Sequence, residues 1–364
     1  TAIDRENKKL AVFDKKSGET YEEPYDDLVI ATGSSPVVPP IPGIDGEGIH
    51  TLWTVPDTDR IKRIVEERKP ETAAVIGGGF IGLEMAENLQ KAGIGVSVIE
   101  MQNQVMAPLD YDMACQIHSY LRGRGVDLRL NQTVTGFYEE DGRLYTQLEG
   151  REAVGADLAI LAIGVAPETH LAKEAGLSLG IRESILVNER METSAEGIYA
   201  AGDCCAGTNI QSGERQIIGL WANANHQGTV AGINMAGGNA RFEGNILHNI
   251  THFMDMDFIG FGDNRIQGET LVFGSLKQGL YLKAVCRDGR IAGVNILDSY
   301  PVSGMIKNYM LRLFRELNLK ILNLEITRSA GSEKHNACAI FSLRLNKKCK
   351  VERLLADLHA VDGV

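Results

Sequence analysis

The glycine-rich segment at 77–82 limits the fold of this chain more than any other feature of its sequence. It reads Gly-Gly-Gly-Phe-Ile-Gly and fits the pattern G-x-G-x-x-G through Gly77, Gly79 and Gly82. An apolar stretch at 73–76 precedes it, and a run typical of a helix follows it. A strand, a glycine turn and a helix in this order predict a Rossmann βαβ unit with a parallel sheet.

The alternation of strands and helices continues beyond the glycine turn. We expect a strand at 95–100, an amphipathic helix at 110–122 capped by Asp110, and a strand at 126–130. Two further strands, at 133–138 and 143–148, are expected to form a hairpin around Asp141-Gly142. A buried strand at 157–163 follows. Strands that are apolar throughout are typical of parallel sheets buried on both faces. The sequence therefore predicts a doubly wound Rossmann unit over roughly residues 70 to 165.

The three motif glycines and Glu100 together predict a dinucleotide site. Gly77 makes the tight turn after the strand, Gly79 lets the backbone approach a pyrophosphate, and Gly82 lets the helix pack against the strand. The pyrophosphate is expected at the helix N-terminus, where backbone N–H groups and the helix dipole favour an anion. Glu100 ends the next strand about twenty residues further on, where the motif requires an acid. The alternative is a glycine-rich turn that binds no ligand.

Glu100 also indicates which nucleotide is bound. A carboxylate accepts hydrogen bonds from the ribose hydroxyls of NAD, but it repels the 2'-phosphate of NADP, which usually requires an arginine. The three residues that follow, Met101, Gln102 and Asn103, are not basic. We therefore expect NADH rather than NADPH.

Composition excludes several other classes of function. The chain has 37 Lys and Arg against 48 Asp and Glu, a formal charge of -11, which disfavours nucleic acid as a partner. No apolar run reaches the length of about 18 residues that a membrane span needs, so we expect a cytoplasmic protein without membrane contact. The cysteines do not have the C-x-x-C or similar spacing of zinc sites and thioredoxin-type pairs; they lie at 115, 204, 205, 286, 338 and 349. No metal is therefore expected.

The segments on either side of the Rossmann unit have their own patterns. Short strands are expected over residues 1–30, followed by an extended linker rich in proline around 36–42. Residues 197–203 read as a buried strand that ends at Asp203, and a helix is expected from 221 to 236. Beyond 240 we expect mixed strands with a hairpin at Arg287-Asp288-Gly289-Arg290, and then a helical and finally basic stretch over 303–364.

Four segments together resemble the pyridine nucleotide-disulfide oxidoreductase family of flavoproteins. Within it they are similar to the branch of NADH oxidases, coenzyme A-disulfide reductases and rubredoxin reductases. The matching segments are Tyr25 to Ser34, Gly77 to Glu87, Ala162 to Pro167 and Gly197 to Cys204, and the resemblance extends from residue 20 to about 300. Each match alone is modest, but their order and spacing together are specific.

The resemblance implies an α/β fold with three parts. A Rossmann-like doubly wound NAD domain at 43–195 is inserted in a partial FAD-binding α/β domain made of 1–42 and 196–238. A C-terminal α+β domain at 239–364 corresponds to the interface domain of the family and implies a homodimer. The first FAD motif of the family, and its redox cysteine where one exists, would lie upstream of Thr1, so no catalytic residue is expected in this chain and FAD is expected to bind weakly.

The same resemblance assigns site residues for both cofactors. For FAD it implies Thr32 and Gly33 close to the flavin, Asp203 at the ribityl chain, and the helix start at Asn223 to Gln227 near the reduced ring. For NAD it implies Phe80, Ile81 and Glu84 at the nicotinamide, with Phe80 as an aromatic gate, and Gly164 where the chain passes the dinucleotide. Core packing for Phe80 and a helix cap for Asp203 are the alternatives.

These residues lead to one main hypothesis and two alternatives. The main one is that hydride passes from NADH to FAD and electrons continue to a disulfide, dioxygen or a small redox protein, with the acceptor not identified by the sequence. The first alternative is an NAD-binding fragment without turnover. The second is a dehydrogenase with a single Rossmann domain and no flavin, which leaves Thr32 and Asp203 unexplained. Cys204 and Cys205 are not assigned a catalytic role, because adjacent cysteines close only a strained disulfide.

Overall fold

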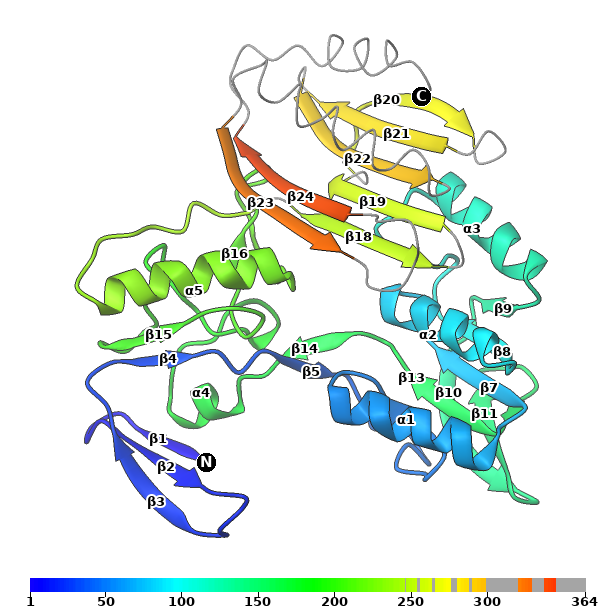
Figure 1. Ribbon diagram of the computed structural model, residues 1–364, viewed down its shortest axis with the longest axis horizontal. Helices are drawn as coiled ribbons and strands as arrows, with labels where there is room; N and C mark the ends of the chain where they lie inside the picture. Colours follow the sequence, from blue (N-terminus) through cyan, green and yellow to red (C-terminus); the bar gives the residue numbers. More distant parts are fainter. Residues whose placement is uncertain are drawn as a thin grey trace. The chain divides into compact units, whose positions relative to one another are not determined.

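The computed structural model divides the chain into two compact units (Figure 1). Unit 1 comprises Thr1–Ser35 and Val165–Leu247, and unit 2 comprises Pro36–Gly164 and the chain from His248 onward. The structure describes residues 1–245, 247–253, 256–263, 266–275, 280–287, 290–298, 320–328 and 337–344.

Unit 2 is built on a five-stranded parallel sheet with the strand order β6-β13-β7-β8-β9. Its strands are β6 (Ile49–Thr51), β7 (Thr72–Ile76), β8 (Gly95–Glu100), β9 (Asp127–Leu130) and β13 (Leu158–Leu161). The helices of this part are α1 (Val55–Arg68), α2 (Phe80–Lys91) and α3 (Tyr111–Gly123). The predicted parallel sheet is confirmed, with all three helices contributing to one buried cluster, and α3 begins after Asp110 as expected.

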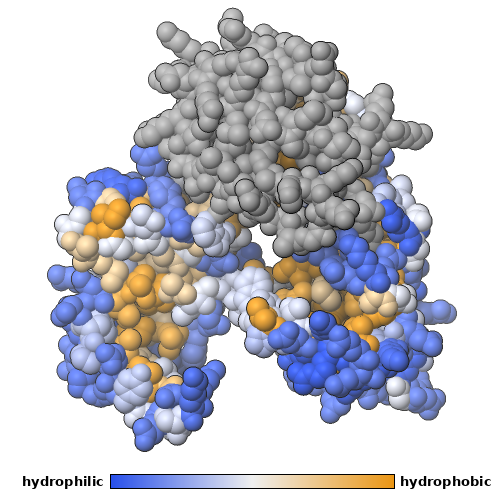
Figure 2. Space-filling model, in the orientation of Figure 1, coloured by the Kyte–Doolittle hydropathy of each residue, from blue (hydrophilic) through white to orange (hydrophobic). Residues whose placement is uncertain are grey.

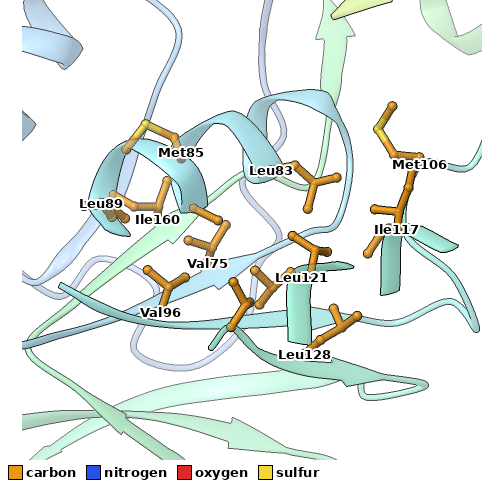
Figure 3. Packing of buried hydrophobic residues seen from close by; sticks show 14 of the residues in the cluster. Val75, Leu83, Met85, Leu89, Val96, Met106, Ile117, Leu121, Leu128 and Ile160 are labelled. Atoms are coloured by element: carbon orange, nitrogen blue, oxygen red, sulfur yellow. The ribbon is translucent and has the colours of Figure 1, made fainter. Parts of the chain in front are cut away.

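The two faces of this sheet are covered by different elements because side chains alternate along each strand. Val75 belongs to a buried cluster with residues of α2 and α3, including Leu83 and Leu121 (Figure 3). Its neighbours Ala74 and Ile76 belong to a second cluster, which includes residues of a three-stranded antiparallel sheet. Burial on both faces explains why β13 and residues 73–76 of β7 are apolar.

The three-stranded sheet consists of β10 (Val134–Glu140), β11 (Arg143–Leu148) and β12 (Val154–Ala156). Asp141 and Gly142 join β10 to β11, and both have positive φ angles, of 52° and 74°. This backbone is typical of a two-residue hairpin turn of type I'. The hairpin predicted around Asp141-Gly142 is therefore confirmed.

A second, antiparallel sheet of unit 2 packs against the Rossmann core. Its strand order is β18-β19-β22-β21-β20, and its members are β18 (His248–Phe253), β19 (Met256–Gly262), β20 (Glu269–Ser275), β21 (Leu280–Arg287) and β22 (Arg290–Asp298). Met256, Phe258 and Leu297 are buried in the same cluster as the side chains of α2 and α3. The hairpin expected at 287–290 is present as the pairing of Arg287 with Arg290.

The helical prediction for 303–364 is wrong where the structure describes that segment. β23 (Lys320–Arg328) and β24 (Ala337–Arg344) form an antiparallel pair. The sequence of β23 contains Leu322, Leu324 and Ile326 at every second position, which is the period of a strand rather than of a helix. The basic stretch expected after Arg344 lies outside the described residues.

The described part of unit 1 contains several small sheets, two α-helices and a short 3-10 helix, η1 (Ile181–Glu183). An antiparallel sheet is formed by β1 (Ala2–Asp4), β2 (Lys9–Phe13) and β3 (Thr20–Pro24). Three strand pairs follow: β4 (Leu28–Ile30) with β15 (Ile198–Ala200) in parallel, β5 (Ser34–Pro36) with β14 (Val165–Pro167), and β16 (Gly207–Thr208) with β17 (Arg215–Gln216). The α-helices are α4 (His170–Glu174) and α5 (Trp221–Met235). The strands expected over residues 1–30 and the helix expected from 221 are confirmed. Asp203 lies three residues beyond the end of β15.

The surface of unit 1 exposes several large apolar side chains. Figure 2 shows apolar residues on the visible face of each unit. Val29 of β4 is 41% exposed and Leu186 is 42% exposed, whereas all three residues of β15 are buried.

Among the described helices, none combines the length and apolar character that crossing a bilayer requires.

The boundaries of units 1 and 2 differ from those of the three domains that we expect from the sequence. Residues 165–195 group with unit 1, although the sequence assigns them to the NAD domain at 43–195. The segment from His248 groups with the Rossmann core in unit 2. Assignment of the segments 1–42 and 196–238 to FAD, of 43–195 to NAD and of 239–364 to an interface stays a prediction.

Candidate functional site

The turn from β7 to α2 shows why each motif glycine is required. Gly77 has a φ of +108°, and a Cβ there would lie 2.3 Å from the carbonyl oxygen of Ala162. At Gly82 a Cβ would lie 2.0 Å from the carbonyl oxygen of Gly77, so only glycine lets α2 approach the strand this closely. Gly79 differs, because no atom of the other described residues lies within 4 Å of the place of its Cβ, apart from its chain neighbours and the backbone of its own helix. Packing therefore explains Gly77 and Gly82, and open space lies beside Gly79.

The N-terminus of α2 is suited to an anion. Gly79 is its N-cap and supplies no side-chain hydrogen bond, and no acidic residue lies in the first turn. The first helical amide with a backbone partner is that of Leu83, which donates to the Gly79 carbonyl at 3.0 Å. The amides of Phe80, Ile81 and Gly82 precede it and have no acceptor within the helix. Such amides and the helix dipole together favour a phosphate group.

Glu100 lies beside the same turn, at the carboxyl end of β8. Its Oε2 accepts a hydrogen bond from the Gly78 amide at 2.7 Å, and its Oε1 accepts one from the Gln102 amide at 2.7 Å. Two backbone donors therefore fix the orientation of this carboxylate. Each oxygen keeps a second lone pair, so the group can also accept hydrogen bonds from a ribose.

Gly164 lies at the same edge of the parallel sheet. The strand before it, β13, pairs with β7, and the Ala162 amide donates to the Ile76 carbonyl at 2.8 Å just beyond the strand ends. Gly164 has a φ of +115°, and apart from its chain neighbours none of the described residues has an atom within 4 Å of the place of a Cβ. It thus lines open space at the carboxyl edge, where ligands of doubly wound sheets bind.

Phe80 and Glu84, two residues predicted at the nicotinamide, contact the antiparallel sheet of unit 2. The Phe80 ring is half-buried and stacks on Phe258 of β19, with 5.9 Å between the ring centroids. Glu84 Oε1 accepts a hydrogen bond from the hydroxyl of Thr251 in β18 at 2.5 Å. Core packing, the alternative considered for Phe80, accounts for one side of its ring, and the gate role stays a prediction. Sequence reasoning missed both Thr251 and Phe258.

The residues predicted for FAD lie together in unit 1. The Thr32 hydroxyl donates to the Glu168 carbonyl at 2.5 Å, and Gly33 has a φ of +74° with open space at the place of its Cβ. Asp203 Oδ2 accepts a hydrogen bond from the Ser34 hydroxyl at 3.0 Å. A side-chain partner across the unit, rather than a helix amide, thus orients Asp203. Ser34 is a further residue that sequence reasoning did not single out.

Asn223 and Gln227 are fully buried in the first turns of α5. Asn223 Nδ2 donates to the Ile218 carbonyl at 3.0 Å, and Gln227 Oε1 accepts from the Gly202 amide at 2.8 Å. The remaining polar atoms, Asn223 Oδ1 and Gln227 Nε2, have no hydrogen-bond partner in the described structure. These side chains therefore anchor the start of α5 to the loop after β15. Contact with a flavin would come from the amides at the helix start, where no side chain provides a cap.

The adjacent residues Cys204 and Cys205 form hydrogen bonds with the backbone of the same loop after β15. Cys204 donates its thiol to the carbonyl of Ala201 at 3.3 Å, and Cys205 donates to the carbonyl of Gly202 at 3.3 Å. Both thiols are free and buried. The hydrogen bond with Cys204, together with burial, raises the pKa of Cys205. A packing role accounts for this pair.

Comparison with known proteins gives one family and many relatives. The sequence model of the pyridine nucleotide-disulphide oxidoreductases matches residues 1–228. An NADH oxidase of Methanocaldococcus jannaschii is 32% identical over 341 residues, which cover 89% of this chain and 75% of that protein. A CoA-dependent NAD(P)H sulfur oxidoreductase of Pyrococcus abyssi is 34% identical over 249 residues, covering 68% of this chain. The match covers only 55% of the Pyrococcus protein.

Solved structures agree with the sequence relatives. The water-forming NADH oxidase from Lactobacillus brevis, determined with bound NADH, superposes with a TM-score of 0.77 at 27% identity. The superposition covers 85% of this chain and 72% of that one. The similarity therefore extends over both units and over most of the described residues.

Proposed function

Because the chain belongs to the pyridine nucleotide-disulphide oxidoreductase family, we propose that it is a flavin-dependent enzyme that oxidises NADH. Bound FAD, which Thr32, Gly33 and Asp203 would hold, would supply the chemistry that takes up hydride from NADH and delivers two electrons to a disulfide, dioxygen or a small redox protein. For a disulfide, NADH, one proton and the disulfide give NAD⁺ and two thiols. The observation that carries this proposal is the open glycine turn at Gly79 with the oriented carboxylate of Glu100 beside it.

The residues of unit 2 hold NADH in this proposal. The pyrophosphate lies against Gly79 and the free amides at the start of α2, and Glu100 accepts the ribose hydroxyls. Gly77 and Gly82 shape the turn, and Gly164 leaves space where the dinucleotide passes β13. Phe80, Ile81 and Glu84 lie at the nicotinamide end, since α2 continues there from the pyrophosphate site.

The residues of unit 1 suit FAD, because they combine open space, an oriented carboxylate and a helix start. Thr32 and Gly33 form the turn beside the flavin, and Asp203 accepts hydroxyls of the ribityl chain. The uncapped start of α5 at Trp221–Asn223 stabilises negative charge on the ring. FAD supplies the two-electron redox chemistry when bound, and the chain contributes binding, orientation and electrostatics.

Two measurements on the purified chain test this function. Calorimetric titration is expected to show NADH binding, and NADH absorbance at 340 nm is expected to fall when FAD and an acceptor are supplied. Dioxygen, a small disulfide and an oxidised redox protein should be tried separately. NADH binding without turnover under all three conditions supports the alternative of an NAD-binding fragment. Hydride transfer to an organic substrate without flavin would overturn the proposal.

The homodimer and the cytoplasmic location are finer parts of the same proposal. The antiparallel sheet β18 to β22 occupies the position in the chain at which the family's interface domain is expected, which supports a dimer. The formal charge of -11 disfavours nucleic acid as a partner. Light scattering after size-exclusion chromatography tests the dimer, and a mass of one chain would contradict it.

A further inference from the structure

The hydrogen bond between Thr251 and Glu84 links two elements that are distant in sequence. Glu84 lies in the second turn of α2, and Thr251 lies in β18, which runs next to that helix (Figure 1). Thr251 is 7% exposed, whereas the Glu84 side chain is exposed. A buried hydroxyl from the antiparallel sheet therefore holds an exposed carboxylate on the helix that begins at the glycine turn.

This hydrogen bond restricts the Glu84 carboxylate. A glutamate on a helix surface normally samples several rotamers, because its side chain has three rotatable bonds. The Thr251 hydroxyl donates to Oε1 at 2.5 Å, and hydrogen bonds to a charged acceptor are in general stronger than those between neutral groups. The other oxygen, Oε2, has no hydrogen-bond partner among the described residues. Glu84 is thus held through one oxygen, and the other can still accept a hydrogen bond.

A second contact from the same hairpin acts on Phe80. Phe258 of β19 is fully buried and stacks on the half-buried Phe80 ring. Thr251 and Phe258 are partners across the β18–β19 register. One pair of neighbouring residues in this hairpin therefore holds two side chains at the start of α2.

We propose that Thr251 is a positioning residue for the nicotinamide end of the NADH site, acting through Glu84, and that Phe258 supports Phe80 in the same way. This inference rests on the proposed function. It gives the antiparallel sheet of unit 2 a part in nucleotide binding beyond its expected role at an interface. The hydroxyl of Thr251 orients the carboxylate before the nicotinamide arrives, which lowers the entropy lost on binding.

The test compares two ligands on the full chain. NADH carries the nicotinamide, and ADP-ribose carries the same pyrophosphate and both riboses without it. Thr251→Val removes the hydroxyl and keeps the shape of the side chain. We expect it to weaken NADH binding about tenfold in calorimetry and ADP-ribose binding less than about twofold. Thr251→Ser restores the hydroxyl and is expected to return NADH affinity to within about threefold of the unaltered chain.

A matched control comes from β11. Thr146 is 1% exposed, and its hydroxyl has no hydrogen-bond partner in the described structure, so Thr146→Val removes a buried hydroxyl that holds nothing. This variant is expected to bind both ligands like the unaltered chain. Glu84→Ala changes an exposed position and provides the same test if Thr251→Val does not fold. This variant should also weaken NADH binding more than ADP-ribose binding.

The outcomes separate this inference from the proposed function. Binding of neither ligand by the unaltered chain overturns the proposed function and the inference with it. Binding of both ligands, with an equal or absent effect of Thr251→Val on the two, overturns the inference alone. A selective loss of NADH affinity in Thr251→Val and Glu84→Ala that is not additive in the double variant supports it.

Discussion

The Glu100 carboxylate accepts a hydrogen bond from the Gly78 amide at 2.7 Å, so the acid that ends β8 is joined to the glycine turn that begins α2. The Gln102 amide donates to its other oxygen. Glu100 therefore has a structural role in the turn in addition to the ribose contact proposed for it. Its orientation is set before any nucleotide binds.

Glu100 is expected to select NADH over NADPH by at least tenfold, or about 1.4 kcal/mol. Its charge repels a 2'-phosphate, and no basic residue follows it at 101–103. Glu100→Ala should weaken binding of both nucleotides, because the turn loses its hydrogen bond, and should also narrow the ratio between them. Calorimetry with each nucleotide measures both effects.

Gln102→Ala is the control for this prediction. Gln102 is exposed and uncharged, and only its backbone takes part in the hydrogen bond to Glu100. The ratio of the two affinities should stay unchanged in this variant. Equal affinities for NADH and NADPH in the unaltered chain contradict the role of Glu100.

Gly79 and Gly82 are expected to respond differently to a side chain. Gly79→Val places its side chain in open space that the pyrophosphate is expected to fill, so NADH affinity should fall by at least about tenfold while the melting temperature changes little. Gly82→Ala places a Cβ 2.0 Å from the Gly77 carbonyl oxygen, so its melting temperature should fall. Thermal unfolding and NADH titration of both variants check this. Unchanged NADH affinity in Gly79→Val would show that the pyrophosphate lies elsewhere.

The Rossmann unit could be predicted from sequence because its signals are local. The motif glycines, Glu100 and the Asp141-Gly142 turn each follow from neighbouring residues, and the structure contains the corresponding elements. Helix α1 was not predicted, although a local signal exists. Thr54 and Asp57 form a capping box at its start, with the Thr54 side chain accepting from the Asp57 amide.

The contacts of Thr251 and Phe258 could not be predicted in this way. Thr251 lies 167 residues from Glu84, and nothing in its neighbourhood in sequence indicates a partner on α2. Such contacts arise only when the antiparallel sheet packs on the helix. The grouping of residues 165–195 with unit 1 has the same origin, since it depends on tertiary packing, for example of Leu177 and Ile185 with Ile198.

Asp157 is expected to stabilise unit 2 in a manner that depends on pH. Its Oδ2 accepts from the amides of Glu71 and Thr72 at 2.8 Å each and from the Thr72 hydroxyl at 3.1 Å. Burial acts to raise the pKa of Asp157, but these hydrogen bonds outweigh it and lower the pKa. Because the folded pKa is lower than the unfolded value, of about 3.9, the stabilisation is present above that value and is lost as pH falls through the folded pKa.

Asp157 is exposed, so solvent screens its charge, and Asp157→Ala should therefore destabilise the chain by at most about 1 kcal/mol at pH 7 and by less as the pH approaches 3. Urea unfolding at a series of pH values measures this difference. Asp141→Asn serves as the control, because Asn also tolerates the positive φ of 52° at that hairpin position. A destabilisation in Asp157→Ala that is the same at pH 7 and pH 3 would refute the role of its charge.

A polar cluster joins α3 to the antiparallel sheet of unit 2. Lys283 lies 3.3 Å from an oxygen of Asp110 and 3.0 Å from one of Asp112, and its side chain is 14% exposed. The Tyr281 hydroxyl donates to Asp112 Oδ2 at 2.9 Å. Burial, the hydrogen bond to Asp112 and the negative charges of Asp112 and Asp110 raise the pKa of Tyr281 to about 12.

Tyr281 is accordingly expected to lose its proton later than an ordinary tyrosine. Because its folded pKa lies above the unfolded value of about 10, its hydrogen bond stabilises the fold fully below pH 10 and stops doing so as pH rises through about 12. The difference in absorbance at 295 nm between the unaltered chain and Tyr281→Phe isolates this one residue, and its midpoint should lie near 12. The same difference measured in an Asp112→Asn background should move toward 10, because the negative acceptor is gone. A midpoint near 10 in the unaltered chain would mean that Asp112 does not accept this hydrogen bond in solution.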